Sequence, residues 1–250
     1  MDNVITKSAV SRIRSLRDKR FRDQSGLFVA EGAKLVRDLI DGGMEPESLY
    51  VCGDDDMGVP AVAVSAGDMA RMSHLKTPSS VLAVMKKRPA VFDCASWHDN
   101  LVIALDGVQD PGNLGTIIRA ADWFGIEQIV CSPSTADLYN TKAVQATMGA
   151  LCRVNVCYMP LEPLLERAAG EDVPVYGTFL DGDDIYSSPL TRGGVVVMGN
   201  EGQGISDSVG AAVTRRLLIP PFPAGRVTGE SLNVGVATAI VCALFRGRLR

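Results

Sequence analysis

Apolar and polar residues follow each other along the chain in the order typical of alternating strands and helices. Two short runs, 101–105 and 194–198, are apolar at nearly every position, which is typical of strands in a parallel sheet covered on both faces. Strands are predicted at 101–105, 127–131, 153–157, 173–177, 194–198 and 216–219, and helices at 113–124, 140–148, 160–169, 206–213 and 231–245. The pattern predicts an α/β domain with a mostly parallel sheet.

The first part of the chain predicts a smaller α/β unit. A basic helix is expected at 7–23, further helices at 31–40 and 66–73, and strands at 26–29, 48–52, 61–64 and 81–84. The stretch from Lys86 to Pro89 breaks this pattern, and residues 90–100 show little periodicity. We therefore expect one domain at 1–88, a linker at 89–100 and a second domain at 101–250.

The composition is that of an ordinary globular protein. Of 250 residues, 46% are hydrophobic, but no run reaches the roughly 18 apolar residues of a membrane helix. The N-terminal residues lack the features of a signal peptide, so we expect a cytoplasmic protein with no membrane partner. The six cysteines form no C-x-x-C pair, and neither His74 nor His98 has a metal-like partner nearby. No metal is assigned.

Positive charge is concentrated at the N-terminus, although the chain carries a formal charge of −4. Residues 1–22 hold seven Lys or Arg against two Asp, with apolar residues between them. This spacing indicates an amphipathic helix with a basic face that can bind nucleic-acid phosphates, and a solvated helix face is the alternative. The arginines expected to make this contact are Arg14, Arg17, Arg20 and Arg22.

Polar or glycine-rich segments follow three of the predicted strands. They are 106–115, 199–204 and 220–233. Open α/β folds place their ligands at the carboxyl ends of parallel strands, so these three loops are expected to meet at one edge of the sheet.

The first loop is followed by a helix with two candidate site residues, Asn113 and Arg119. Asn113 could simply cap the helix that begins at Leu114. Arg119 lies among small or apolar neighbours, and the natural partner of its guanidinium is a carboxylate or a phosphate.

The second loop, Gly199-x-x-Gly202-x-Gly204, is typical of backbone that approaches a phosphate or nucleotide closely, with a plain turn as the alternative. Its Glu201 is a candidate site residue, or a carboxylate that offsets a helix dipole. A Rossmann oxidoreductase is disfavoured, because the spacing is not G-x-G-x-x-G and no acidic residue ends a strand about twenty residues later.

In the third segment, Ser231 and Asn233 flank Leu232 at the expected start of the last helix. Unpaired N–H groups at a helix N-terminus can bind the polar atoms of a ligand. The structural alternatives are an N-cap for Ser231 and a polar first-turn residue for Asn233.

Taken together, the motifs are far more specific than any one of them. Asp-Pro-Gly-Asn-x-Gly before Arg119, then Met-Gly-Asn-Glu-Gly-x-Gly, then Ile-Pro and Ser-Leu-Asn-Val occur in this order. The combination resembles the SpoU (TrmH-like) family of RNA 2′-O-ribose methyltransferases. The resemblance covers residue 101 to the end, and Arg20-x-Arg22, 28–32 and Thr77-Pro78 also resemble the family's substrate-binding domain.

This resemblance implies S-adenosylmethionine as the cofactor, a deep trefoil knot in the C-terminal domain, and a front domain similar to L30e-like RNA-binding modules. It also implies a homodimer with the site at the subunit interface. Backbone groups at Gly199, Ile219 and Leu232 would hold the cofactor. The catalytic and substrate-positioning set would be Asn113, Arg119, Glu201, Ser231 and Asn233.

Chemistry narrows two of these roles. A guanidinium keeps its proton, so we expect Arg119 to bind phosphate or stabilise the developing alkoxide. Glu201 would then organise the site or take part in proton removal.

Ribosomal RNA is the expected substrate, and the alternatives are transfer RNA or a non-catalytic RNA-binding protein. The segment 220–230 is longer than in many relatives. Its Phe222 and Arg226 either contact RNA or belong to an insertion without a role in binding.

Overall fold

The computed structural model describes residues 5–223, 226, 227, 229 and 231–247. The chain divides into two compact units. Unit 1 comprises Met1–Pro89 and Asp137–Arg153, and unit 2 comprises Ala90–Ala136 and Val154–Arg250. The segment 137–153, which lies within the second domain predicted from the sequence, therefore packs with the first part of the chain.

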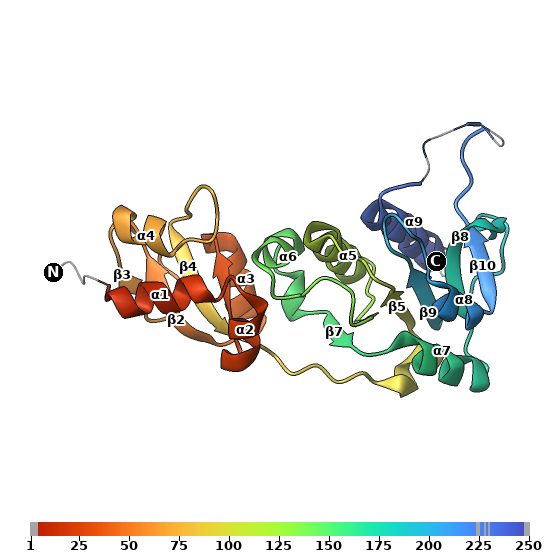
Figure 1. The fold of residues 1–250 in the computed structure, drawn as a ribbon, viewed down its shortest axis with the longest axis horizontal. Coiled ribbons are helices and arrows are strands. Elements are labelled where there is room, and N and C mark those ends of the chain that lie inside the picture. Colours follow the sequence, from red (N-terminus) through yellow and green to blue (C-terminus); the bar gives the residue numbers. More distant parts are fainter. Residues whose placement is uncertain (1–4, 224–225, 228, 230, 248–250) are drawn as a thin grey trace. The chain divides into compact units, whose positions relative to one another are not determined.

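Unit 1 is built on a four-stranded sheet in the order β1-β4-β2-β3 (Figure 1). The strands are β1 (Leu27–Glu31), β2 (Pro46–Val51), β3 (Val62–Ala63) and β4 (Val81–Lys86), and the helices that follow β1 and β3 are α3 (Ala33–Asp41) and α4 (Ala66–Met72). Strand β4 pairs antiparallel with both β1 and β2. Ile13 and Leu16 pack in the core of this unit with Met69, Met72 and Leu82.

The basic segment forms two helices, α1 (Lys7–Ser15) and α2 (Lys19–Ser25), so the prediction of one helix at 7–23 is wrong. Asp18 lies between them with extended backbone, and its side chain accepts a hydrogen bond from the N–H of Arg20. This N-cap begins α2 shortly after α1 ends at Ser15. The burial of Ile13 and Leu16 nevertheless agrees with the amphipathic pattern.

The segment 137–153 holds α6 (Thr141–Thr147) and η2 (Ala150–Cys152). Within unit 1, the Asp137 carboxylate accepts from Arg22 Nη2 at 2.5 Å, and the Thr141 hydroxyl lies 3.2 Å from His74 Nδ1. These two polar contacts join residues that are far apart in sequence. They help to hold the segment on the N-terminal part of the chain.

Unit 2 contains a six-stranded sheet in the order β10-β8-β9-β5-β6-β7 (Figure 1). The strands are β5 (Leu101–Leu105), β6 (Gln128–Cys131), β7 (Asn155–Tyr158), β8 (Val175–Asp184), β9 (Gly194–Met198) and β10 (Arg215–Leu218). Every pairing between these described strands is parallel, which confirms the predicted α/β class and sheet. Strand β8 continues to Asp184, beyond its predicted end.

Helices cover both faces of this sheet. On one face, Trp97 packs with Val102 and Val197 in a core that also takes residues from the helices α7 (Leu161–Gly170) and α8 (Asp207–Ala211). On the other face, the rings of Tyr176 and Phe245 meet edge to face, with centroids 5.0 Å apart. This face carries α5 (Pro111–Trp123) and α9 (Val234–Gly247), which contact each other.

The predicted linker 89–100 holds a short 3-10 helix, η1 (Cys94–His98), and Trp97 within it is fully buried. In the described part of the chain, no helix combines the length and apolar character needed to cross a membrane. The trefoil knot remains a prediction from the resemblance.

Candidate functional site

The three motif loops begin at the same edge of the unit 2 sheet. Strands β5 and β9 are direct neighbours, with Leu105 paired to Met198 at their carboxyl ends. The N–H of Asp106 continues this pairing by donating to the Met198 carbonyl at 2.9 Å. Strand β10 runs parallel to both and is separated from β9 by β8, so the segment that follows β10 leaves from the same edge. The sequence-based prediction of a shared edge is confirmed.

Asn113, Glu201 and Asn233 form a hydrogen-bonded chain that joins the three motifs. Asn113 Nδ2 donates to Glu201 Oε1 at 2.9 Å, and Asn233 Nδ2 donates to Asn113 Oδ1 at 2.9 Å. Glu201 also accepts the backbone N–H groups of Gln109 and Asp110, each at 3.2 Å. The carboxylate therefore fixes the first loop against the second, and Asn113 connects both to the start of α9.

The caps of α5 and α9 differ from those considered in the sequence. Asp110 caps α5 by accepting the N–H of Asn113, so Asn113 is not the cap and its side chain is free for the chain of hydrogen bonds. Asn233 caps α9, because its Oδ1 accepts the N–H groups of Gly235 and Val236. Ser231 lies before the cap, so the capping interpretation of Ser231 is wrong.

Hydrogen bonds keep Glu201 ionised. Burial opposes the charged form, but donation from Asn113, from its own N–H and from those of Gln109 and Asp110 outweighs it and lowers the pKa of the carboxyl below its usual range. A carboxylate with a lowered pKa is a weak base. The electrostatics therefore favour organising the loops over proton removal as the role of Glu201.

A cavity of about 670 Å³ opens beside this network. Its volume lies in the range of small-molecule and cofactor sites. All three predicted cofactor residues, Gly199, Ile219 and Leu232, line it, together with Glu201 and Ser231. The remaining lining comes largely from the end of β9, the loop 200–205 and the β8 residues 178–180.

Backbone packing shapes the floor of the cavity at Gly199. A Cβ atom on this residue would lie 2.3 Å from the backbone of Gly204 and Ile205, so only glycine fits there. Asn200 closes the same loop: its Oδ1 accepts the N–H groups of Gly202 and Gln203, while its Nδ2 donates to the Gly107 carbonyl. The motif glycine thus lets two segments meet closely beside the cavity.

Sequence reasoning missed two residues that hold these loops. Asn200 stands between two residues singled out by the motif, and its turn-forming side chain could have been recognised. Asp106 directly follows β5 and accepts both the N–H and the hydroxyl of Ser206, at 2.8 and 2.7 Å. No local pattern indicates that contact, because Asp106 and Ser206 are one hundred residues apart.

Protein-family models match both the C-terminal and the N-terminal part of the chain. Residues 100–243 match the SpoU rRNA Methylase family, and residues 7–83 match the MRM3-like substrate binding domain. This chain belongs to the SpoU rRNA methylase family. As a family member it is an S-adenosylmethionine-dependent RNA 2′-O-ribose methyltransferase with an N-terminal substrate-binding domain.

Relatives and solved structures match the SpoU chain over nearly its full length. The 23S rRNA guanosine 2′-O-methyltransferase RlmP of Bacillus subtilis is 30% identical, and the match covers 94% of each chain. The AdoMet-bound rRNA methyltransferase of Sinorhizobium meliloti has a TM-score of 0.84 at 28% identity, covering 100% of this chain and 98% of that one. A TrmH-family protein of Porphyromonas gingivalis has a TM-score of 0.83 at 35% identity, covering 98% and 99%.

Arg119 of this SpoU chain lies on α5, six residues after Asn113, and is exposed. Within the described residues, its guanidinium makes no hydrogen bond or ion pair. Arg119 does not line the cavity that holds the predicted cofactor residues. The side chain is therefore available for a phosphate or carboxylate outside this chain.

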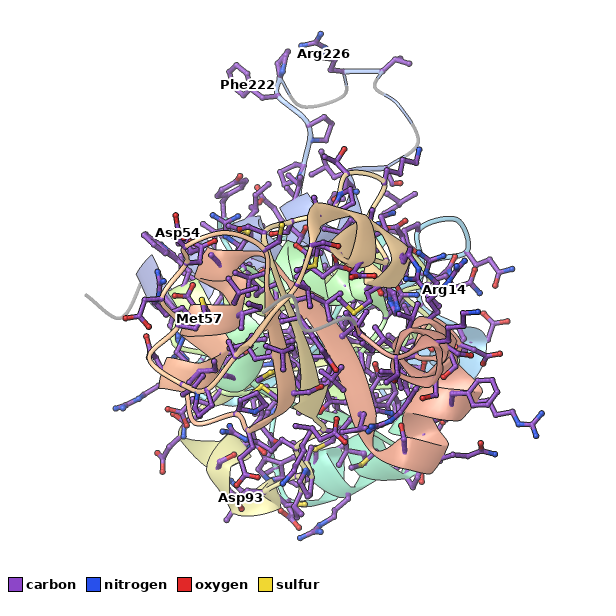
Figure 2. The ribbon with its side chains drawn as sticks, turned by 90° about the vertical axis from the view of Figure 1, so that its left-hand side faces the viewer. Arg14, Asp54, Met57, Asp93, Phe222 and Arg226 are labelled. Carbon is purple, nitrogen blue, oxygen red and sulfur yellow. The ribbon has the colours of Figure 1, made fainter. Side chains whose placement is uncertain are left out.

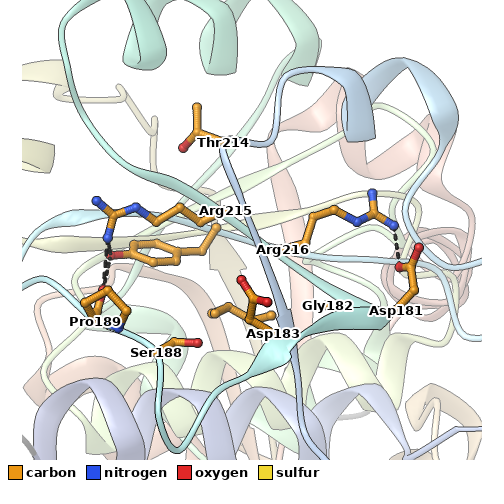
Figure 3. A pocket seen from close by; sticks show the side chains of 10 residues that line it. Asp181, Gly182, Asp183, Ser188, Pro189, Thr214, Arg215 and Arg216 are labelled. Carbon is orange, nitrogen blue, oxygen red and sulfur yellow. Dashed lines mark hydrogen bonds and ion pairs between the residues drawn. The ribbon is translucent and has the colours of Figure 1, made fainter.

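A second cavity of about 380 Å³ lies against β8 and β10 (Figure 3). Its two arginines are already paired: Arg215 donates to the Tyr176 hydroxyl and the Pro189 carbonyl, and Arg216 pairs with Asp181. Internal partners therefore occupy both guanidinium groups of this cavity. None of the predicted site residues lines it.

The four arginines of the basic segment in unit 1 have different surroundings. Arg14 and Arg20 are exposed, and their guanidinium groups have no partner among the described residues. Arg17 is also exposed but donates to the Ser73 carbonyl. Arg22 is only 2% exposed and is occupied by Asp137 and two backbone carbonyls, so this residue holds unit 1 together and is not accessible to RNA.

Proposed function

We propose that the protein transfers a methyl group from S-adenosylmethionine to a ribose 2′-hydroxyl of ribosomal RNA, and that the motif residues of unit 2 form the site. The observation that carries the proposal is the hydrogen-bonded chain of Asn113, Glu201 and Asn233 beside the cavity lined by Gly199, Ile219 and Leu232. Three motifs that are distant in sequence meet there, as a transfer reaction between two bound molecules requires.

Gly199, Ile219 and Leu232 are the residues proposed to hold the cofactor. The closely packed glycine and the volume of the cavity fit a small molecule held through backbone groups. When bound, S-adenosylmethionine supplies the methyl group on a positively charged sulfur. Ser231 also lines the cavity, so its hydroxyl can orient a polar group of the cofactor or of the RNA.

Arg119 is proposed to bind a phosphate of the RNA or to stabilise the oxygen that attacks. A ribose hydroxyl is a weak nucleophile, and a cation beside it stabilises the charge that develops on the oxygen. Glu201 positions Asn113 and the first loop. Asn233 caps the start of α9 and also donates to Asn113, so it holds the third motif against the first.

Arg14, Arg17 and Arg20 are proposed to bind RNA phosphates. Two of the three guanidinium groups have no partner among the described residues, which suits them to phosphate binding. The MRM3-like match over residues 7–83 supports a substrate-binding role for this part of the chain. The similarity to L30e-like modules and the cytoplasmic location remain predictions.

A homodimer is also proposed, and α5 supplies the support. Trp123 on this helix is 86% exposed, which is unusual for a large aromatic side chain. Arg119 precedes it by one helical turn, so the two side chains lie on the same face. A second copy that covers Trp123 would bring Arg119 to the subunit interface, as the family resemblance implies.

Transfer of a labelled methyl group to total rRNA and, separately, to total tRNA tests the function. Nucleoside digestion then identifies the product. A 2′-O-methylated nucleoside from rRNA is expected. A product from tRNA alone would show that the substrate is transfer RNA and not ribosomal RNA. If neither pool gives a product although the cofactor binds, the result would favour a non-catalytic RNA-binding protein.

A further inference from the structure

The segment between β10 and α9 leaves the cofactor cavity and returns to it. Leu218 and Ile219 line the cavity at one end of this segment, and Ser231 and Leu232 line it at the other. Between them the chain carries Phe222, whose side chain is 89% exposed. Figure 2 shows Phe222 and Arg226 standing clear of the ribbon from which this segment emerges. An exposed aromatic ring therefore lies on the segment that connects two parts of the cavity lining.

Local sequence restricts how Phe222 is presented. Pro221 and Pro223 flank it directly, and each proline ring fixes a backbone φ angle. The N–H of Arg226 donates to the Pro223 carbonyl at 3.1 Å, which places a cation one turn after the ring. The Arg226 side chain has no hydrogen bond or ion pair with the part of the chain that is described. The two prolines and the backbone hydrogen bond of Arg226 preorganise the segment, and this lowers the entropy lost when a ligand binds.

We propose that Phe222 stacks on an unpaired RNA base close to the methylated ribose, and that Arg226 binds a neighbouring phosphate. The inference rests on the proposed function, because it assumes that RNA enters the cofactor cavity. Aromatic rings with nearby arginines are the usual means of binding single-stranded nucleic acid. A base in a duplex cannot offer its face in this way, so the target ribose lies in a loop, bulge or other unpaired region.

The length of the chain limits the position of the stacked base. Phe222 is three residues from Ile219, so its backbone lies within roughly 11 Å of the cavity lining. The base on Phe222 is therefore close to the methylated ribose along the RNA strand.

Substitutions in this segment test the inference. Phe222→Ala should raise the KM for rRNA by roughly 5- to 100-fold, as expected for the loss of one stacked base, and should leave the Kd for S-adenosylmethionine unchanged. Phe222→Trp should keep near-wild-type KM because indole also stacks.

The phosphate contact has its own variant. Arg226→Gln should raise the KM for rRNA and reduce the dependence of this KM on salt. Val227→Ala is the matched control, since Val227 is 95% exposed in the same segment but cannot stack.

A binding experiment separates this inference from the proposed function. The probes are a short unstructured RNA and the same strand annealed to its complement. Emission from the Phe222→Trp variant should be quenched, relative to wild type, by the single strand and not by the duplex. Quenching without any methyl transfer would overturn the proposed function alone. Equal KM in Phe222→Ala and wild type, or a parallel loss of cofactor affinity, would overturn the stacking role.

Discussion

Asn113 has two polar groups on its side chain, and each serves a different loop. Its amide donates to Glu201 and its carbonyl accepts from Asn233, while Asp110 takes over the capping of α5. The motif residue is therefore more than a helix cap. Its amide group explains why asparagine suits this position, because aspartate would place a second carboxylate against Glu201.

Arg119→Ala should lower kcat/KM for methyl transfer by more than about tenfold, because the site would lose its cation for phosphate or the developing alkoxide. The side chain is exposed, so thermal unfolding and cofactor affinity should not change. Arg119→Lys is the matched variant and should recover part of the activity, since it keeps the charge without the planar fork. A loss below tenfold in the alanine variant would contradict the role.

His74 should make the stability of the protein depend on pH. Burial, together with the nearby positive charges, lowers its pKa to about 4, although the hydrogen bond to the Ile13 carbonyl opposes the shift. Between the ordinary histidine pKa of 6.5 and this lowered pKa, the unfolded chain binds a proton at His74 while the folded chain does not. Stability should therefore fall as pH decreases from about 6.5 to 4, because the unfolded state binds more protons there.

Urea unfolding across this pH range provides the measurement for His74. His74→Gln should remove most of the dependence, at some general loss of stability from the altered hydrogen bonds. His98→Gln, which changes the other histidine of the chain, is the control and should retain it. An equal slope in wild type and in His74→Gln would show that another group titrates.

At the scale of the elements, strand ends and helix starts build the site together. Strands β5, β9 and β10 end at one edge of the parallel sheet, and the segments after them lead into α5, α8 and α9. The close approach of backbone at Gly199 holds the loop after β9 in place. The cavity therefore depends on backbone packing as well as on polar side chains.

Gly199→Ala should greatly weaken S-adenosylmethionine binding. The added methyl group would collide with backbone at 2.3 Å, and backbone cannot move aside as a flexible side chain can. Isothermal titration calorimetry gives the affinity. Gly170→Ala is a suitable control, because the added methyl group there would meet no described atom within 4 Å apart from its chain neighbours and the backbone of its own helix. Unchanged cofactor affinity in Gly199→Ala would place the cofactor elsewhere.

Helices α1 and α2 should contribute to RNA affinity through Arg14 and Arg20. The double variant Arg14→Gln with Arg20→Gln should bind rRNA more weakly, and the slope of log affinity against log salt should decrease by about 1.5, as expected for two lost phosphate contacts. Cofactor affinity should stay constant. Lys34→Gln removes one exposed charge from α3 and is the control. Equal salt slopes in the double variant and wild type would exclude these contacts.

At the scale of the whole molecule, the segment 137–153 joins the compact unit of the N-terminal residues. It follows β6 and precedes β7, both of which belong to unit 2. The chain therefore passes from unit 2 to unit 1 and back within one βαβ connection. Unit 1 thus depends on a piece of chain from the methyltransferase region.

Trp123→Glu should convert a dimer into monomers, because a charged group would replace the exposed ring on the proposed interface. Sedimentation velocity distinguishes the two states. Tyr186→Glu changes another exposed aromatic residue of unit 2 and should leave the dimer intact. Methyl transfer should fall together with dimer formation if Arg119 acts at the interface. Monomeric wild-type protein would rule out the homodimer.

The sequence by itself determined the strands β5 and β9, the parallel sheet and the three loops at its edge. These features follow from local patterns, because apolar runs and glycine-rich turns depend on residues close together in the chain. The family resemblance was also recognisable from the sequence, because the motifs and their order along the chain can be identified without knowing which residues are in contact.

Only the tertiary structure decided which motif residues touch. Asn113 and Glu201 are 88 residues apart, and Arg22 and Asp137 are 115 apart. No local pattern shows that Arg22 is buried against Asp137, since a basic helix face looks the same whether water or a carboxylate covers it. The caps at Asp110 and Asn233 were also settled by the fold, because several neighbouring polar residues could have capped each helix. Long-range packing selects among such locally equivalent choices.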